Sequence, residues 1–176
     1  MSIAVVLAGG KSTRMGHDKA TMYGGVERIQ RCLTEAGFQR IVVLCGSADR
    51  KEAFAGEVMV DPPNIDGLHR LIPWIRNELQ ADILLVPCDA FLLTREAVQR
   101  FLEQAEHGGV PLDDTGTRQP LFAYLPQATR LDELANNVTG LVKAVPSIEV
   151  KEHAACFTNF NTQNDLSRLE RGSPPR

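Results

Sequence analysis

Residues 7–19 read LAGGKSTRMGHDK. It follows an apolar run, residues 3–7, whose length and β-branched content predict a buried strand. The stretch holds three glycines and three cations in thirteen residues. Glycines let the main chain approach an anion and expose N–H groups to it, while Arg14 and Lys19 can neutralise negative charge. The sequence therefore predicts a phosphate cradle, and the alternative is a flexible loop with ordinary surface cations.

Two commoner phosphate-binding loops do not fit this stretch. A P-loop that ends at Gly10 needs a glycine five positions earlier, where this chain has Val5 inside the expected strand. A dinucleotide fingerprint needs the spacing G-x-G-x-x-G, which Gly9, Gly10 and Gly16 do not provide. The cradle therefore belongs to neither class.

Length and composition predict one globular domain over residues 1–171, followed by a disordered tail over residues 172–176. The chain has 176 residues, of which 43% are hydrophobic and 23% are charged. Its net charge of −3 argues against general binding of nucleic acid or of anionic membranes. No apolar run reaches the roughly 20 residues of a membrane span and no signal peptide is recognisable, so we expect a cytoplasmic protein.

The four cysteines, at positions 32, 45, 88 and 156, are widely separated and form no C-x-x-C pair. This spacing indicates neither a zinc site nor a disulfide framework. We therefore expect four reduced and mostly buried thiols.

Apolar runs alternate with segments of helical periodicity. Strands are predicted at residues 3–7, 41–45, 58–60 and 83–86, and helices within residues 29–36, 68–79 and 94–106, the last capped by Thr94. This alternation predicts the α/β class: a three-layer sandwich with helices on both faces, in which a mostly parallel central sheet carries an antiparallel addition. Ligands of such sheets bind outside the carboxyl ends of the strands. The loops after Leu7 and Cys45, together with Asp61 and Asp89, should therefore share one rim.

The alternation loosens after residue 110. A turn is expected at residues 113–117 and a strand at 119–125, which Pro126 ends. Two short helices are expected around residues 131–134 and 141–145. Short strands are expected at 148–150 and 158–160, and a last helical turn at 165–171.

Two aspartates at predicted strand ends are candidate ligands. Asp89 follows strand 83–86, and by itself it fits either a cap of the next helix or a metal ligand. Asp61 follows strand 58–60 and precedes Pro62, so a strand-end turn is its alternative role.

The opening stretch resembles the signature L-A-G-G-x-S-x-R-M-G-x-D-K of the molybdenum cofactor guanylyltransferase family, and every specified position matches. Further family-like segments follow in order: PCD at residues 87–89, QPLFA at 119–123 and FTNFNT at 157–162. The resemblance spans residues 3–166. Two features depart from the family pattern. Cys45 stands where an asparagine near the base is common, and DGLHRL at residues 66–71 stands near the place of a G-P-L-A-G segment.

The resemblance implies a Rossmann-like fold of the nucleotidyltransferase type. It also implies transfer of GMP from GTP to molybdopterin, with Mg²⁺ as cofactor and pyrophosphate as product. It implies catalytic roles for Arg14, Lys19 and Asp89, with Asp89 as the magnesium ligand. The nucleotide-binding residues that it implies are Leu7, Ala8, Gly9, Gly10, Lys19, Asp61 and Asp89. The resemblance implies that Gln119, Asn159 and Asn161 lie on the acceptor side. To these we add Gly67, at the end of the predicted loop at residues 61–67, and Arg70, just after that loop.

The resemblance also implies a preference for GTP over CTP. Related cytidylyl enzymes tend to carry alanine where Gly9 stands, and a methyl group there would crowd a purine edge. Two alternatives stay open: a related nucleotidyltransferase that uses CTP or another phosphate acceptor, and a non-catalytic nucleotide-binding protein. GTP and molybdopterin are the expected partners. The sequence leaves the oligomeric state open, a monomer included.

Overall fold

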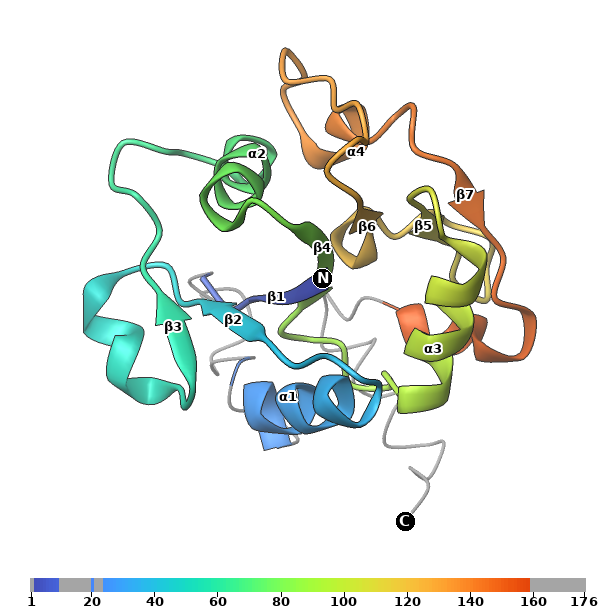
Figure 1. Ribbon diagram of the computed structural model, residues 1–176, viewed down its shortest axis with the longest axis horizontal. Helices are drawn as coiled ribbons and strands as arrows, with labels where there is room; N and C mark the ends of the chain where they lie inside the picture. Colours follow the sequence, from blue (N-terminus) through green and yellow to red (C-terminus); the bar gives the residue numbers. More distant parts are fainter. Residues whose placement is uncertain (1, 10–19, 21–23, 159–176) are drawn as a thin grey trace.

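A computed structural model describes residues 2–9, 20 and 24–158 of the chain and contains a five-stranded sheet at its centre (Figure 1). The strand order is β3-β2-β1-β4-β6. The four parallel strands are β1 (Ser2–Leu7), β2 (Ile41–Leu44), β3 (Glu57–Met59) and β4 (Asp82–Pro87). Strand β6 (Tyr124–Leu125) pairs antiparallel with β4. The predicted α/β class, with its mostly parallel sheet and antiparallel addition, is confirmed.

Helices cover both faces of the sheet. Helices α1 (Gly25–Glu35) and α3 (Arg95–Gln104) pack on one face, and α2 (Leu68–Leu79) and the short α4 (Val138–Leu141) pack on the other. The alternation of side chains along β1 divides them between the two cores: Val6 packs toward α1 and α3, whereas Val5 packs toward α2. The result is the predicted three-layer sandwich.

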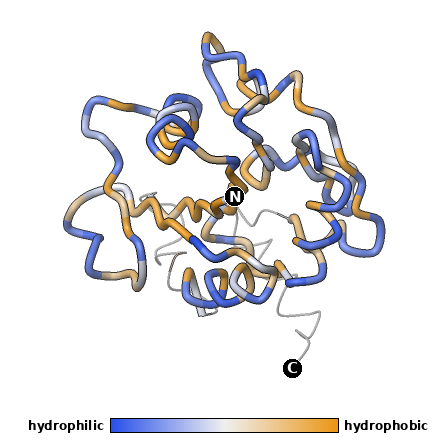
Figure 2. Tube along the Cα trace, viewed as in Figure 1, coloured by the Kyte–Doolittle hydropathy of each residue, from blue (hydrophilic) through white to orange (hydrophobic). Residues whose placement is uncertain are grey.

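The strands at the centre of the sheet are almost entirely apolar, as expected where both faces are covered. Residues 3–7 of β1 and 83–87 of β4 are all buried. In Figure 2 the central strands are orange and much of the outer chain is blue. The hydrophobic strand runs recognised in the sequence are thus the parallel strands, with ends that differ by one residue.

Three phenylalanines from distant parts of the chain meet beside α3. The rings of Phe101 and Phe157 lie 5.5 Å apart between centroids, and Phe122 and Phe157 make an edge contact at 5.6 Å. All three side chains are fully buried. This contact joins η3 (Pro120–Phe122) and η4 (Lys151–Phe157) to the core of the sheet.

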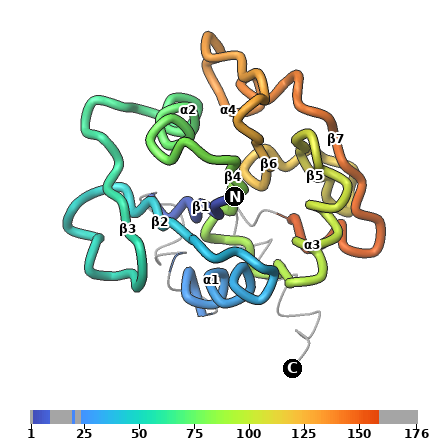
Figure 3. Tube along the Cα trace, in the orientation of Figure 1, coloured from blue at the N-terminus to red at the C-terminus, as the bar shows by residue number. Residues whose placement is uncertain are grey.

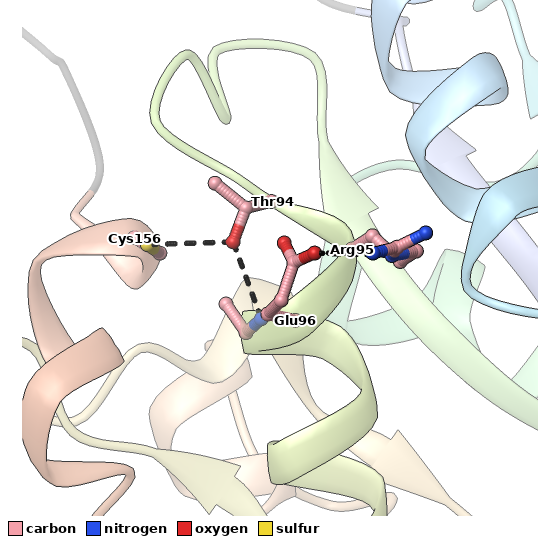
Figure 4. Close-up of polar contacts among 5 residues, drawn as sticks. Thr94, Arg95, Glu96 and Cys156 are labelled. Atoms are coloured by element: carbon pink, nitrogen blue, oxygen red, sulfur yellow. Dashed lines mark hydrogen bonds and ion pairs between the residues drawn. The ribbon is translucent and has the colours of Figure 1, made fainter. Parts of the chain in front are cut away.

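The helix predicted from Thr94 has its expected beginning (Figure 4). The Thr94 hydroxyl accepts a hydrogen bond from the backbone N–H of Ala97 at 3.2 Å, which caps α3. The same hydroxyl lies 4.0 Å from the Cys156 sulfur, so η4 packs against the beginning of α3. All four cysteine thiols are free, as predicted.

The structure corrects the prediction of a strand over residues 119–125. Pro120 fixes its own φ and has no N–H to donate, and the chain turns through the 3₁₀-helix η3 before only Tyr124 and Leu125 pair with β4. Among the described residues, the 3₁₀-helices η2 (Ala48–Ala53) and η4 and the short strand β5 (Val110–Pro111) were not predicted.

The prediction of a helix at residues 131–134 is wrong as well. Asp132 accepts a hydrogen bond from the backbone N–H of Leu134 at 3.2 Å, a local turn bond that competes with a helix. The second short helix, α4, begins earlier than predicted because Asn137 caps it by accepting from the N–H of Gly140 at 2.8 Å. Strand β7 (Ser147–Ile148) likewise begins one residue before the strand predicted at residues 148–150, and it pairs with β5. The expected strand at residues 158–160 and helix at 165–171 lie almost entirely outside the described residues, as does the tail.

Candidate active site

The loops after β1, β2, β3 and β4 all leave the sheet at one edge, because these strands are parallel and neighbouring. From β1 the chain continues to β2 on one side, while β4 lies on the other (Figure 3). Such a reversal in strand order opens a crevice in which α/β sheets bind ligands. The predicted rim therefore exists, and the ends of β1 and β4 border its centre.

Gly9, just after β1, lies against the backbone of Gly46, just after β2. A Cβ atom at Gly9 would be 2.7 Å from both the Cα and the N of Gly46, and one at Gly46 would be 2.9 Å from the Gly9 Cα. Gly46 also has a φ of +85°, which favours glycine. The two loops can approach this closely only because both positions are glycine.

Asp61, after β3, completes this contact. Its Oδ1 accepts a hydrogen bond from the Gly46 N–H at 3.1 Å, and its own N–H donates to the Gly46 carbonyl at 2.9 Å. The Oδ2 atom would be 3.0 Å from a Cβ atom at Gly9. Asp61 therefore bonds to the neighbouring loop and directs its second oxygen toward the end of β1, which a role confined to a local turn would not explain.

Burial sets the electrostatics of this corner. Burial raises the pKa of the Asp61 carboxyl, and the hydrogen bond from Gly46 lowers it by a smaller amount. Burial also raises the pKa of the Cys45 thiol, and the nearby Asp61 charge adds to this effect. The thiol of Cys45 donates to the Ser47 carbonyl at 3.4 Å, so it is engaged within its own loop.

Asp89 lies just beyond β4 and is buried, with 5% of its surface exposed. The N–H of the preceding Cys88 donates to the Leu7 carbonyl at 3.2 Å, which ties the end of β4 to the end of β1. Thr94, not Asp89, caps α3. The helix-cap alternative for Asp89 is therefore excluded, and a buried carboxylate remains at the centre of the rim.

The predicted acceptor residues Gly67 and Arg70 lie at the beginning of α2. Gly67 has a φ of +83°, and a Cβ atom there would be 2.8 Å from the Cε1 and Nδ1 atoms of His69. The imidazole of His69 is thus folded back over Gly67. Arg70 is exposed in the first turn of the helix.

Gln119 contacts a buried carboxylate instead of facing open solvent. Its side-chain amide donates to Oδ2 of Asp113 at 2.6 Å, while Oδ1 of Asp113 accepts from the N–H groups of Thr115 and Thr117, both at 2.9 Å. Asp113 thereby organises the predicted turn at residues 113–117. In this structure the Gln119 amide supports that turn.

Several predicted site residues lie outside the described residues: Gly10, Arg14, Lys19, Asn159 and Asn161. Two described residues close to these segments make defined contacts. The Ala20 carbonyl accepts from the Val26 N–H at 2.9 Å, and the Phe157 side chain is 1% exposed in the aromatic contact.

The described part of the rim consists of Leu7, Ala8, Gly9, Gly46, Asp61 and Asp89. Of these residues, Gly46 was not predicted as a site residue. Its position directly after a predicted strand was the available signal.

A mostly parallel open sheet with a glycine contact and two carboxylates along its switch-point edge is the arrangement in which α/β proteins bind ligands. Residues 4–149 match the family described as MobA-like NTP transferase domain. The chain belongs to this family, and the enzymes of the family are nucleotidyltransferases.

Individual relatives cover almost the whole chain. A molybdenum cofactor guanylyltransferase of Xanthomonas euvesicatoria is 32% identical, over 97% of this chain and 95% of the relative. A probable molybdenum cofactor guanylyltransferase of Bacillus cereus is 29% identical, over 95% of this chain and 94% of the relative. Among solved structures, molybdopterin-guanine dinucleotide biosynthesis protein A of Archaeoglobus fulgidus superposes with a TM-score of 0.68 at 20% identity, over 97% of each chain.

Two kinds of feature were not found in the part of the chain that the structure describes. Within it, no group of three or more His, Cys, Asp or Glu side chains is placed to hold a metal ion. None of the helices described has the length and apolar character needed to cross a membrane.

Proposed function

We propose that this nucleotidyltransferase transfers GMP from GTP to the terminal phosphate of molybdopterin and releases pyrophosphate. The observation that carries the proposal is the arrangement at the rim, where Gly9, Gly46 and Asp61 form one tight corner and Asp89 lies beside it across β1. The guanylyltransferase names of whole-length relatives support the choice of substrates.

The corner fits a purine nucleotide. Main-chain atoms near Gly9 can approach a base edge because no side chain projects there, and an ionised Asp61 can accept hydrogen bonds from the N–H groups of guanine. Because the Cys45 thiol is engaged with Ser47, we assign recognition of the base to Asp61 and the main chain. The matching signature assigns the triphosphate to Arg14 and Lys19.

The donor chemistry at Asp89 suits Mg²⁺. Magnesium prefers oxygen ligands, keeps several waters and needs only one or two protein carboxylates together with phosphate oxygens. A single buried aspartate at the end of β4 is therefore sufficient, and a cluster of three ligands is not required. When bound there, magnesium would neutralise charge on the phosphate oxygens.

The protein contributes position and charge to the reaction. A terminal-phosphate oxygen of molybdopterin forms a bond with the α-phosphorus of GTP, and the bond from that phosphorus to the bridging oxygen breaks. Pyrophosphate leaves with the electron pair, and Arg14 and Lys19 stabilise its charge. A phosphate acceptor already carries ionised oxygens at pH 7, so no general base is required.

The first test is a panel of nucleoside triphosphates, with turnover measured as pyrophosphate release in the presence of molybdopterin and Mg²⁺. We expect GTP to be preferred over CTP. Tighter binding of CTP in calorimetry would refute the assignment of the base. GTP binding without any turnover would favour a non-catalytic nucleotide-binding protein.

The second test uses Lys19→Ala and Asp89→Asn, which should stay folded and each slow turnover by roughly a hundredfold or more, the scale for losing one preorganised charge-stabilising group. The matched controls are Lys143→Ala and Asp114→Asn, exposed residues that are not among the predicted site residues. Near-normal rates in the two rim variants would contradict the mechanism.

The acceptor side has its own test. Arg70 is exposed beside Gly67 and His69, so its guanidinium can reach a phosphate or a pterin. Arg70→Ala should weaken the use of molybdopterin more than the binding of GTP, whereas exposed Arg31→Ala on α1 should change neither. If Arg70→Ala weakened the use of molybdopterin and the binding of GTP equally, Arg70 would not belong to the acceptor site.

A further inference from the structure

Arg28, in α1, holds the loop that carries Asp89. Its guanidinium donates two hydrogen bonds into the segment that joins β4 to α3, one from Nη1 to the Leu93 carbonyl at 3.1 Å and one from Nη2 to the Ala90 carbonyl. Figure 3 shows α1 beside this segment. The two acceptors lie one and four residues after Asp89, so a single side chain fixes the backbone immediately beyond the proposed metal ligand.

The Asp89 segment is neither helix nor strand. Its own backbone makes short-range turn hydrogen bonds, in which Ala90 donates to Pro87, Phe91 to Asp89 and Leu93 to Ala90. Ala90 and Leu93 are buried, and besides Arg28 their carbonyls accept from the Leu93 N–H at 3.2 Å and from the Cys32 thiol at 3.8 Å, respectively. A charged donor gives stronger hydrogen bonds than a neutral one. Arg28 therefore does more to fix this backbone than a neutral side chain would.

The first turn of α1 contacts Ala20, the described residue that follows the glycine-rich loop. The Val26 N–H donates to the carbonyl of Ala20, the residue after Lys19. A Cβ atom at Gly25 would be 2.0 Å from that same carbonyl oxygen, and Gly25 has a φ of +51°, so this contact requires glycine. Helix α1 thus supports the end of the glycine-rich loop with its first turn and the Asp89 segment with Arg28.

We propose that Arg28 is a positioning residue that sets the Asp89 carboxylate relative to the end of the glycine-rich loop. This inference rests on the proposed function, because it assigns Asp89 to the reaction. Burial lowers the pKa of the Arg28 guanidinium, but an arginine stays protonated at neutral pH, so its two carbonyl contacts keep a full positive charge. Arg28 touches neither substrate nor metal in this scheme and acts only through the backbone of the Asp89 segment.

The test compares Arg28→Met, Arg28→Lys and the control Arg31→Met, an exposed arginine on the same helix. Methionine keeps much of the buried stem but donates no hydrogen bond, and lysine keeps the charge but loses the planar fork that reaches both carbonyls. We expect kcat of Arg28→Met to fall about 10- to 100-fold, the scale for a small misplacement of a catalytic group. Arg28→Lys should be intermediate, and Arg31→Met should match the wild type. The KM for GTP should change less than twofold.

Two further measurements separate positioning from simple stabilisation. Hydrogen exchange in a peptide covering residues 88–94 should become faster in Arg28→Met and stay unchanged in Arg31→Met. In a double-mutant cycle, Arg28→Met should slow the Asp89→Asn enzyme less than twofold, because residues that act through one group are not additive. A folded Arg28→Met enzyme with normal kcat, or full additivity in the cycle, would overturn the inference and leave the proposed function standing. Failure of wild-type enzyme to turn over any nucleotide would overturn both, and the wild-type assay distinguishes this case.

Discussion

Replacement of Gly9 by alanine tests the tight corner of the rim with one methyl group. The new Cβ would lie 2.7 Å from the Cα and N atoms of Gly46 and 3.0 Å from Oδ2 of Asp61. Favourable carbon contacts are about 3.5–4.0 Å, so the overlap with the Gly46 backbone is roughly 1 Å. Neither backbone atom can move by a change of rotamer. The loops after β1 and β2 would have to separate.

The magnitude follows from this overlap. Forcing one extra methyl group into close-packed surroundings costs about 1–3 kcal/mol, and a rigid backbone neighbour places Gly9→Ala in the upper half of that range. Gly9 does not have a left-handed φ, so alanine adds no backbone strain there and gains about 0.4–1 kcal/mol by restricting the unfolded chain. We expect a net loss of about 1–2.6 kcal/mol in the free energy of unfolding. Displacement of Asp61 should also weaken GTP binding about tenfold, or ~1.4 kcal/mol.

Denaturant unfolding and calorimetric binding of GTP and CTP measure these effects. The control is Gly37→Ala, where φ is +110° and a Cβ atom would meet nothing within 4 Å, so it brings backbone strain without a clash. That control should retain GTP affinity. If Gly9→Ala changed neither stability by more than about 0.5 kcal/mol nor GTP affinity, the reasoning about the corner would be refuted. A loss confined to GTP would indicate crowding of the purine, whereas an equal loss for CTP would indicate displacement of the loops.

Three more outcomes follow from the described residues. Because the pKa of the Asp61 carboxyl is raised in the folded protein, the folded state binds a proton at this carboxyl more readily than the unfolded chain does. The contribution of Asp61 to the free energy of unfolding should therefore fall as the pH rises from the ordinary pKa of 3.8 through the raised pKa. GTP affinity, which needs the ionised form, should fall on acidification at a pH above 3.8, and titration of Asp61→Asn should lack this step. Phe157→Ala should lower the free energy of unfolding by about 3–5 kcal/mol in denaturant titration, against less than about 0.5 kcal/mol for the 92% exposed Leu134→Ala. Burial raises the pKa of Cys32 to about 11, so its alkylation at pH 8 should be far slower in the native protein than in denaturant, and equal rates would contradict its burial.

The framework of the fold could be predicted from the sequence because its signals are local. A buried parallel strand is a short apolar run, and α1, α2 and α3 each repeat apolar residues at the period of a helix. The rim followed from the same signals, since the carboxyl ends of parallel strands share an edge. Among the described residues from 110 onward, the elements are only two to four residues long or are 3₁₀-helices, and hydrophobic periodicity cannot define such short segments. The errors at residues 119–125 and 131–134 fall in this region.

The polar residues that follow β1, β3 and β4 could be recognised from the sequence alone, and the opening signature indicated the family. What those residues contact became known only from the packing of the fold. Gly9 meets Gly46 across two loops, Arg28 reaches carbonyls 62 and 65 residues further along the chain, and the Gln119 amide is taken up by Asp113. The physical reason is that the pattern of neighbouring residues in the sequence indicates only the face or turn on which a side chain lies. Its hydrogen-bond partners depend on how separate elements pack, and no short stretch of sequence records that packing.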